Sequence, residues 1–527
     1  MSWSRFARHT KWYPIFPGLW TNDDAGSDIP TDQIALPSLV GRTMKEAAGA
    51  MYLAQATNVF SPGISRIIRK RPGFTEVRGT AINAAGIFTS LIHQGEMADR
   101  MLMTVSIAAG SHNIYVDDAN PPSAVAGGTN FTIGADNLID ALLFSDGTNP
   151  GAIFLSRLRD LPQFVNNSGT RSNFTIAGTG LTSLKPSFGE VFAQRALYGD
   201  VNFDGTVYDD RVYWSDIRDG NLISDPTTQF LSFETRLKDR VRGIRKISDI
   251  CMIGKLNNIF TMVPTPNASE PFMVQEEPGG RNKGPVSHHA MLEIDGKLFW
   301  LGQSNIHSLS QDFSINDWAD PIQTTIRGLN DARREFSISA VDSDRALIFF
   351  NVSNSAQSTN DLTIALNYKT GALYLWTLRR NALGYRDVSG QQRIIGGGYV
   401  GKFYNEMTGT AGNLDDATAV YDADVWTPRL WVNGYQTKQK IPFVLLSVDP
   451  IGTEQLTVQY RLDDDTSWSD PTGSPYTVSG TDDSIMCVPI QAVARRIQLR
   501  IRNNRADEIY LVKSIGIPAM PLQPAIN

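Results

Sequence analysis

Cysteine is nearly absent from this sequence of 527 residues, which contains only Cys251 and Cys487. Two cysteines so far apart argue against a disulfide framework and against a cysteine-rich metal site, and we expect both to be small buried side chains. Long apolar runs are also missing. None approaches the ~20 residues of a membrane helix, and the N-terminal cations are not followed by the apolar stretch of a signal peptide. We therefore expect a protein made and kept in a cytoplasm, or assembled there into something larger.

An excess of positive charge is missing as well. The 48 lysines and arginines are outnumbered by 54 aspartates and glutamates, which gives a net charge of −6. The chain as a whole is therefore not a general DNA-binding polycation. A length of 527 residues exceeds what one hydrophobic core usually organises and leaves room for two or three domains. The 44 glycines and 27 prolines predict many turns.

The motifs of common enzyme classes are absent too. The sequence contains no Gly-x-Ser-x-Gly elbow, phosphate-binding loop or dinucleotide fingerprint. His288 and His289 are too close for both rings to bind one metal from a regular strand, so no zinc site is predicted. Acidic groups such as Glu276–Glu277 and Asp463–Asp465 lie among turn residues, where solvated side chains are expected. A glycosidase needs two acids that converge in space, and the sequence alone leaves that open.

One segment copies the first half of a calcium-binding loop. Oxygen-bearing side chains stand at Asp200, Asn202 and Asp204, before Gly205. The position of the bidentate acid is occupied by the cation Arg211, and a strand pattern follows where a helix should flank the loop. We therefore expect an Asx-type turn rather than a metal site, and no cofactor is predicted.

Short β-strand patterns are what the sequence has in abundance. From about residue 80 to 430, short apolar and aromatic runs recur, each ended by glycine, asparagine or aspartate. Clear hairpins turn at Asp295–Gly296 and at Lys369–Gly371. Many short strands without intervening helices are typical of a sandwich, barrel or propeller, and repeated hairpins over this length favour the propeller. Residues 165–190 are rich in Asn, Ser, Thr and Gly and are expected to form a long loop insertion.

The two ends of the chain differ from this middle part. An aromatic N-terminal arm without any regular period should pack against its own chain or against a neighbouring subunit, and the candidates for that second contact are Trp3, Trp12, Tyr13 and Trp20. A short helix is predicted from Thr43 to Ala56, with Thr43 and Glu46 in a capping-box pattern. Clean alternation in Arg496–Arg502 and similar runs predicts a β-sandwich at the C-terminus.

These patterns predict a mainly β protein in three parts. Residues 1–79 would form the N-terminal arm and a platform segment, and residues 80–430 a β-propeller with its insertion near 165–190. Residues 431–527 would form the C-terminal β-sandwich, as part of the same platform.

One basic stripe is a candidate for contact with DNA or with a partner. Arg236, Lys238, Arg240 and Arg242 recur at every second position, so an extended segment would place all four side chains on one face. In a symmetric ring, the copies of this stripe would form a basic collar. A solvated strand face, or salt bridges to a neighbouring segment, accounts for the same pattern.

A second basic run, Arg69, Lys70 and Arg71, ends an extended segment and is a further candidate for such a contact. Pro72 restricts Arg71 to an extended conformation, and Gly73 supplies the positive φ of a type II turn. The expected local structure is a basic strand end closed by a tight turn.

Several stretches resemble one protein family. The basic run that ends in Arg71-Pro72-Gly73-Phe74 is similar to the opening of the tail nozzle proteins, also called tail hub or stabilisation proteins, of short-tailed bacteriophages. Four later stretches resemble that family's strand and hairpin patterns: Arg211–Asp216, Val241–Phe260, Leu298–Leu309 and Asn367–Trp376. The sequence departs from the pattern at Asn305, where the family often has glycine, and at Leu375, which separates two aromatic residues.

The resemblance implies a six-bladed β-propeller on a β-rich platform made from both ends of the chain. It implies a structural virion protein of a podovirus tail, assembled in the host cytoplasm as a homohexameric ring below the portal and adaptor rings. Such a nozzle would retain the genome and conduct double-stranded DNA during ejection without sequence recognition. It would also offer docking sites for tail fibres or spikes and act on the host envelope only indirectly. The family has no catalytic residues, so no enzymatic activity is expected.

The alternative function is that of a β-propeller that binds or cleaves glycans. That function requires carboxylates that converge at the centre of the propeller, together with exposed aromatic side chains.

Overall fold

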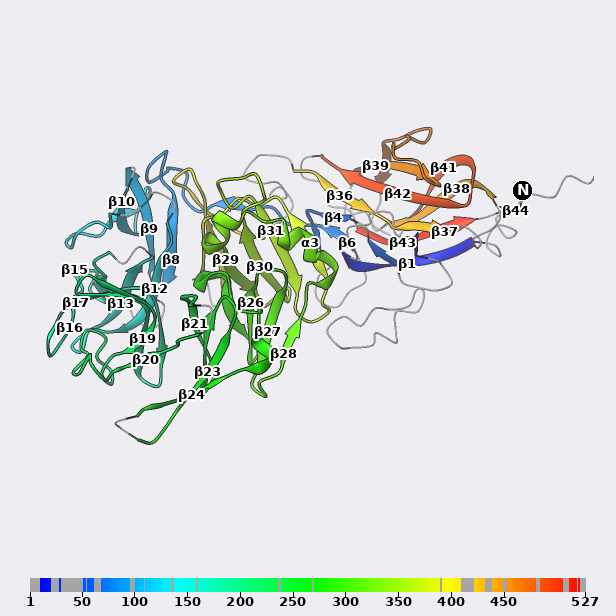
Figure 1. Cartoon of the computed structure of the whole chain (residues 1–527). Coiled ribbons are helices and arrows are strands. Elements are labelled where there is room, and N and C mark those ends of the chain that lie inside the picture. Colours follow the sequence, from blue (N-terminus) through cyan, green and yellow to red (C-terminus); the bar gives the residue numbers. More distant parts are fainter. Residues whose placement is uncertain are drawn as a thin grey trace, which may run out of the picture.

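The structure is a computed structural model of the chain, and it describes residues 10–19, 28–29, 51–53, 55–60, 68–94, 100–108, 110–132, 134, 137–157, 160–235, 238–267, 270–388, 391–408, 421–431, 438–448, 453–479, 484–505, 511–518 and 520–521. β-Strands dominate these residues (Figure 1). The described helices are short: η1 (Pro278–Gly280), η2 (His288–Ala290), η3 (Asp320–Ile322), α3 (Gln323–Arg327) and η4 (Asp331–Phe336). None of them has the length and apolar character needed to cross a membrane.

Seven antiparallel meanders follow one another along the described chain. The first three consist of β8 (Phe88–His93), β9 (Met101–Ala108), β10 (Ser111–Val116) and β11 (Ser123–Ala124); β12 (Ile139–Ser145), β13 (Pro150–Ser156), β14 (Gln163–Asn166) and β15 (Arg171–Asn173); and β16 (Ile176–Gly178), β17 (Leu181–Phe192), β18 (Arg195–Phe203), β19 (Thr206–Trp214) and β20 (Phe230–Ser232). The next two consist of β21 (Val241–Ile247), β22 (Ile250–Lys255), β23 (Ile259–Pro264) and β24 (Phe272–Glu276); and β25 (Met291–Ile294), β26 (Lys297–Leu301), β27 (Ile306–Ser310) and β28 (Ile315–Asp317). The last two consist of β29 (Ile338–Asp342), β30 (Leu347–Val352), β31 (Leu362–Asn367) and β32 (Leu373–Trp376); and β33 (Ala382–Val388), β34 (Gln391–Gly397), β35 (Phe403–Asn405) and the N-terminal β7 (Thr75–Glu76).

These meanders are the blades of a closed propeller. Strand β8 packs beside β12, β12 beside β17, and β17 beside β21, and the order continues through β25, β29 and β33 back to β8. The last blade takes β7 as its outer strand, with Glu76 opposite Tyr404 in antiparallel register. The predicted fold class is therefore confirmed. The described residues form seven blades where six were expected, because they fold into seven successive meanders, the last of which gains β7 as its outer strand.

The local turn chemistry explains several of the hairpins. Asp295 and Gly296 adopt φ values of 50° and 68°, the two positive angles of a type I′ turn, and they join β25 directly to β26 as the sequence predicts. In contrast, residues 165–190 are not a loop insertion. They contain the end of β14, β15, β16 and most of β17, because Val165, Ile176 and Leu184 supply buried apolar side chains between the polar turns.

Strands from both ends of the chain form a second unit beside the propeller, at the right of Figure 1. One sheet has the order β3 (Met51–Leu53), β1 (Thr10–Leu19), β43 (Leu511–Pro518), β38 (Gln439–Val448) and β41 (Ser484–Ala494), with β44 (Met520–Pro521), β6 (Ile68–Lys70) and β5 (Val59–Phe60) attached. The other contains β2 (Asp28–Ile29), β37 (Arg429–Trp431), β42 (Arg496–Asn503), β36 (Ala423–Trp426), β4 (Gln55–Thr57), β39 (Thr453–Leu462) and β40 (Tyr476–Ser479).

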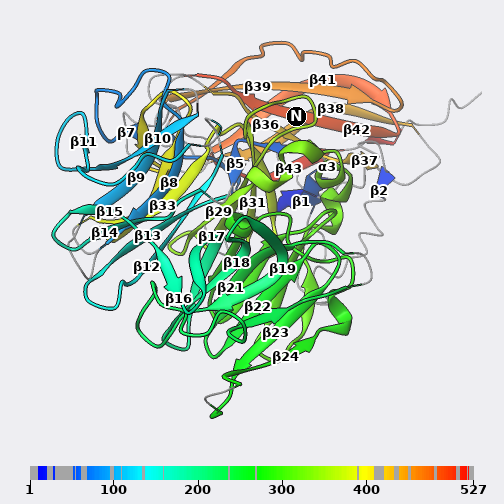
Figure 2. The same cartoon turned by 60° about the vertical axis from the view of Figure 1, so that its left-hand side comes forward.

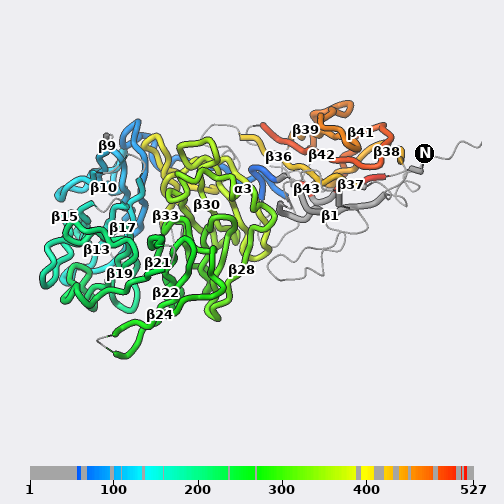
Figure 3. Tube along the Cα trace, viewed as in Figure 1, coloured from blue at the N-terminus to red at the C-terminus, as the bar shows by residue number. Residues whose placement is uncertain are grey.

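The two sheets share one apolar core. Val444 and Val488 from the first sheet belong to the same cluster as Val458 and Leu499 from the second, which makes the unit a β-sandwich. The alternation predicted in β42 places Ile497, Leu499 and Ile501 in this core. The Cα trace in Figure 3 shows the orange and red strands of this sandwich set apart from the cyan and green blades.

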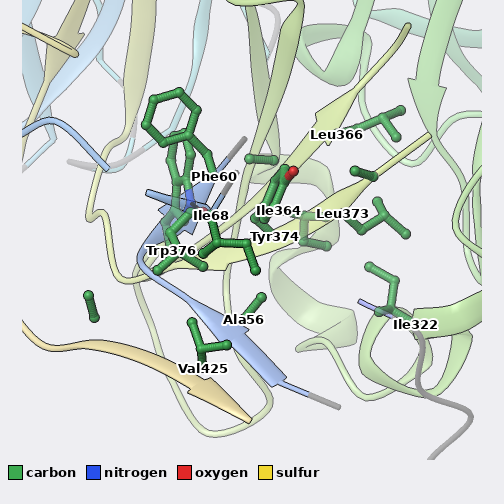
Figure 4. Close-up of a cluster of buried hydrophobic side chains, with 14 of the residues drawn as sticks. Ala56, Phe60, Ile68, Ile322, Ile364, Leu366, Leu373, Tyr374, Trp376 and Val425 are labelled. Atoms are coloured by element: carbon green, nitrogen blue, oxygen red, sulfur yellow. Dashed lines mark hydrogen bonds between the residues drawn. The ribbon is translucent and has the colours of Figure 1, made fainter. Parts of the chain in front are cut away.

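The sandwich and the propeller meet at the sixth blade. Strand β4 pairs with both β32 and β36, so a single sheet runs from the propeller into the sandwich. Figure 4 shows the apolar side chains at this joint, where Phe60 and Ile68 lie near Trp376. The indole Nε1 of Trp376 donates to the carbonyl oxygen of Val59 at 2.8 Å.

Two local expectations fail near this joint. The helix predicted over residues 43–56 lies outside the described residues up to 50, and its second half contains β3 and β4 instead. Ala56 pairs with Val425, because a place in the sheet satisfies the backbone hydrogen bonds of β4 across its length and outweighs helix propensity. Gly73 does not adopt a positive φ, so the predicted type II turn does not form. Residues 71–73 instead connect β6 of the sandwich to β7 of the propeller without regular structure.

Candidate functional site in the propeller channel

The centre of the propeller contains a cavity of about 780 Å³. Its walls come from the innermost strands of all seven blades, and β12, β17 and β21 lie side by side in the turned view of Figure 2. This volume falls within the roughly 300–1,000 Å³ typical of small-molecule sites. Polar side chains line part of the wall: Ser90, Asp140, Glu190, Arg245, Lys246, His289, Glu293, Ser339 and Tyr385.

At one side of this cavity the buried lining residue Asp140 faces His288, which does not itself line the cavity. Asp140 Oδ2 lies 3.3 Å from Nε2 of His288 and accepts from the backbone N–H of Gly189 at 2.8 Å. The other imidazole nitrogen, Nδ1, accepts from the N–H of Ile244 at 3.3 Å, which leaves Nε2 to carry the proton toward Asp140. The His288 ring also stacks on Phe188, with centroids 4.8 Å apart. These contacts fix the position and orientation of the imidazole.

Charge complementarity keeps Asp140 ionised. Burial alone would raise the pKa of Asp140, but the facing His288, with His289 and Arg245 nearby, holds that pKa well below its usual value. Asp140 is therefore a hydrogen-bond acceptor at neutral pH and not a proton donor.

Four more polar side chains belong to the lining. Nη1 of Arg245 lies 3.3 Å from Oε2 of Glu190. Burial lowers the pKa of His289 to about 3, so this ring is neutral at physiological pH. Burial also raises the pKa of Tyr385 to about 12, and its hydroxyl oxygen accepts from the N–H of Val341. The site thus offers the ionised Asp140, the Arg245–Glu190 ion pair, and the neutral His289 and Tyr385, and it can bind a polar ligand by hydrogen bonds.

A glycine allows the histidine segment to approach strand β21. A Cβ at Gly243 would lie 2.3 Å from Met291 Sδ and 3.2 Å from His288 Cα. A larger residue there would have to displace the Met291 side chain and crowd the His288 backbone, so Gly243 permits this close packing of η2 on β21.

A cluster of arginines lies at the mouth of the channel. Arg157, Arg240 and Arg242 each form an ion pair with Glu335 of η4. Nη1 of Arg240 also lies 4.0 Å from Oδ2 of the buried Asp200. Together with Ser187, Phe188 and the two histidines, these side chains enclose a gap of about 30 Å³. We call the three arginines with Glu335 the mouth cluster.

The predicted basic stripe is therefore divided by the fold. Arg240 and Arg242 belong to the mouth cluster and are paired with carboxylates. Lys238 is exposed in a turn with φ of 49°, and Arg236 lies outside the described residues. The positive φ at Lys238 breaks the extended conformation that one shared face would require.

The second basic run is largely internal. Lys70 and Arg71 are each 1% exposed. Nζ of Lys70 donates to Asn503 Oδ1 at 3.2 Å, and both cations lie over the ring of Tyr421. Arg69 is partly buried in β6. Lys70 and Arg71 hold the joint together and are not accessible to DNA in this chain.

The remaining predicted residues are the calcium candidates Asp200, Asn202 and Asp204, which form hydrogen bonds within the fold. Asn202 and Asp204 shape the β18–β19 hairpin, where Asn202 Oδ1 accepts from the N–H of Gly205 and Asp204 accepts from Thr182 and Ser183. Asp200 accepts from the hydroxyl of Ser187, and no group of three or more metal-binding side chains occurs in the described part of the chain.

The aromatic arm is described only in part. Trp12 and Tyr13 lie in β1, which pairs through its backbone with β43 of the same chain, opposite Gly516 and Ile515. Trp3 and Trp20 lie outside the described residues.

The sequence did not single out the residues of the channel as a set. His288 and His289 were noted only as a poor zinc site, and Asp140, Glu190 and Arg245 were not predicted. A usable signal exists for Asp140, which is the one charged residue of β12, the otherwise largely apolar first strand of its blade. Glu190 lies in β17, the second strand of its blade, and Arg245 lies in β21 beside Arg242 and Lys246, so no comparable pattern marks them.

The fold and the site together define a seven-bladed β-propeller with a polar central cavity, joined to a β-sandwich. No family model and no curated protein sequence matches this chain.

Solved structures that it matches include a streptogramin B lyase, at 11% identity over 63% of this chain and 97% of that one, with a TM-score of 0.40. A catalytically inactive virginiamycin B lyase from Staphylococcus aureus with quinupristin matches at 10% identity over 63% and 98%, with a TM-score of 0.40. A gluconolactonase from Xanthomonas campestris matches at 9% identity over 57% and 95%, with a TM-score of 0.32.

These matches correct one expectation. The prediction that the chain has no enzymatic activity is contradicted, since all three proteins are named as enzymes. At such identities the likeness concerns the fold, so no particular reaction is carried over from them.

Proposed function

We propose that this protein binds a glycan in the central channel of its propeller. The observation that carries the proposal is the convergence of Asp140, Glu190 and Glu293 from three different blades on one cavity of about 780 Å³. Sugars present several hydroxyl groups at once. The channel offers ionised acceptors in Asp140 and Glu190, and donors in Arg245 and the serine hydroxyls of its wall.

Glycan cleavage would require more of these carboxyl groups than binding does. It requires one carboxylic acid with a raised pKa as proton donor and a second, ionised carboxylate. Asp140 fits the ionised role because its pKa is lowered. Glu190 lines the same cavity beside Arg245 and is the second carboxyl group to test.

The test is glycan binding and turnover by single-residue variants. We expect Asp140→Asn and Glu190→Gln each to weaken binding of a recognised oligosaccharide by at least about tenfold, since each change removes a charged acceptor from the cavity. Asp204→Asn is the matched control, because Asp204 lies in an exposed hairpin turn. Calorimetric titration measures binding, and release of reducing ends measures cleavage. Unchanged affinity in both channel variants would refute the proposal.

A second candidate function is the phage tail nozzle suggested by the sequence motifs. One structural observation favours it: the N- and C-terminal strands share the sheets of a sandwich beside the propeller, which is the arrangement that the resemblance implies. In this case the chain would form a homohexamer in the virion, contact the adaptor ring and tail fibres or spikes, and let double-stranded DNA pass through the ring.

Native mass measurement of the chain, alone and mixed with an adaptor ring, tests this second candidate. A ring of six copies bound to the adaptor is the expected result. A chain that stays monomeric in the presence of the adaptor would exclude the nozzle function and leave the channel proposal unaffected.

A further inference from the structure

The mouth cluster contains more positive charge than its carboxylates can balance. Three guanidinium groups, from Arg157, Arg240 and Arg242, converge on the single carboxylate of Glu335, and the one other acid lining the same gap is Asp200. The side chains of the three arginines are 20–28% exposed, so they are partly removed from water. Repulsion among them is therefore screened less than it would be at an open surface.

Hydrogen-bond donors are also in excess. Each guanidinium carries five N–H donors, whereas Glu335 offers two oxygens: Oε1 binds Arg240 and Arg242, and Oε2 binds Arg157. Nε of Arg242 is buried and has no hydrogen-bond partner. Burial, and then the neighbouring charges of Arg240 and Arg157, lowers the pKa of Arg242 to about 10. A further oxyanion would satisfy this donor and reduce the repulsion.

Two of the arginines are also positioned by contacts other than the Glu335 carboxylate. Arg157 follows β13, stacks on Phe336 at 4.4 Å and donates to Asn137 Oδ1 at 3.0 Å. Arg242 is part of β21, whose backbone is paired with β22. Glu335, in contrast, projects from the short 3₁₀ helix η4, so rotation of one side chain removes its carboxylate from the cluster.

The gap beside Glu335 is small, with a volume of about 30 Å³. His289 borders both this gap and the large cavity, so a ligand in the channel lies next to the cluster. An anionic group on that ligand would reach all three guanidinium groups by taking the place of the Glu335 carboxylate, which pairs with each of them.

We propose that Arg157, Arg240 and Arg242 form a binding site for the carboxylate or sulfate group of an acidic glycan, and that Glu335 occupies this site in the free protein. The inference deepens the proposed glycan function and rests on it for the rest of the ligand. Planar guanidinium forks match the geometry of carboxylate and sulfate oxygens, which is why arginine is suited to this role.

Calorimetric titration with three oligosaccharides of equal length, one neutral, one built of uronic acids and one sulfated, tests the proposal. Glu335→Ala frees the arginines, so binding of an acidic ligand should tighten by at least about tenfold. Arg242→Gln should weaken it by a similar factor, and neither change should alter binding of the neutral ligand. The uronate and the sulfated ligand show which anion the site prefers. Asp422→Ala is the matched control, because it removes the carboxylate paired with Arg502 in the sandwich.

A second measurement tests the anion site even if the Arg242→Gln variant does not fold. Thermal unfolding of the wild-type protein and of Glu335→Ala is followed with increasing glucuronate or sulfate alone, and the variant should gain more stability than the wild type. Two outcomes would overturn the anion site. One is that the wild type and Glu335→Ala gain the same thermal stability from the free anions. The other is that the acidic oligosaccharides bind no more tightly than the neutral one to any of the variants. Absence of binding by all three oligosaccharides would instead refute the glycan proposal, and the response to the free anions would still decide the anion site.

Discussion

Asn58 offers a quantitative test of how the propeller is fixed to the sandwich. Its side chain is 2% exposed and its φ is 54°. Oδ1 accepts from the N–H of Thr377 at 2.9 Å and from Nε of Arg71 at 3.2 Å. Nδ2 donates to Thr377 Oγ1 at 3.0 Å and to the carbonyl oxygen of Asp422 at 2.8 Å. One residue thus ties the sixth blade, the β6–β7 connection and the start of β36 together.

Replacing Asn58 by alanine removes all four hydrogen bonds. A buried donor left without its partner costs about 1–3 kcal/mol, so the loss at Thr377 and Arg71 amounts to roughly 2–6 kcal/mol. Alanine at a left-handed position adds about 1 kcal/mol. We therefore expect Asn58→Ala to lower the free energy of unfolding by about 4 kcal/mol. Asn58→Gly should cost about 1 kcal/mol less, because glycine tolerates the positive φ.

Urea unfolding followed by tryptophan fluorescence measures these differences, and Trp376 lies next to this joint. Asn58→Asp is the informative companion, because it keeps the acceptor for Arg71 and loses only the amide donors, for an expected cost of about 1–2 kcal/mol. A loss below about 1 kcal/mol for Asn58→Ala, or an equal loss for Asn58→Asp, would show that these hydrogen bonds do not hold the joint.

Other predictions concern the pH dependence of stability, the packing at Gly243 and the binding of calcium. The pKa of His289 falls from 6.5 to about 3 on folding, so stability should be full above pH 6.5 and decline as the pH falls toward 3, by up to roughly 4 kcal/mol. The lowered pKa of Asp140 acts in the same direction below about pH 4. Denaturant midpoints across this range check the slope, which His289→Phe should flatten. Gly243→Ala should cost about 1–3 kcal/mol through the clash with Met291 and weaken ligand binding, as thermal unfolding and calorimetry would show. Chelation should leave the melting temperature unchanged, because Asp204 already accepts hydrogen bonds from Thr182 and Ser183 within its hairpin turn; a drop on adding chelator would restore the calcium hypothesis.

Much of the secondary structure was predictable because it depends on neighbouring residues. The Asp295–Gly296 turn forms where the dipeptide predicts it, since both residues tolerate positive φ. The alternation of β42 predicts which of its side chains enter the sandwich core. The predictions failed where contacts with residues distant in the sequence determine the local structure. Ala56 has strong helix propensity but lies in a strand between β32 and β36.

The charged residues show most clearly the difference between what neighbouring residues determine and what distant partners determine. Period-two spacing identified Arg240 and Arg242 as a pair on one face, yet their pairing with Glu335 joins residues that lie more than 90 positions apart in the chain. Asp140 and His288 are brought together from the second blade and from the segment before the fifth. No local pattern encodes such a meeting, because it depends on the closure of all seven blades.

The sequence by itself determined a mainly β chain of short hairpins, because turn chemistry and side-chain alternation act over a few residues. Tertiary structure alone decided how the last blade is completed, since β7 reaches it from the N-terminal segment. It also turned Lys70 and Arg71 from surface cations into buried parts of the joint, because β6 pairs with β43 from the opposite end of the chain as well as with its neighbour β5. The polar channel arises in the same way, as single charged residues from separate blades share a cavity only after the ring has closed.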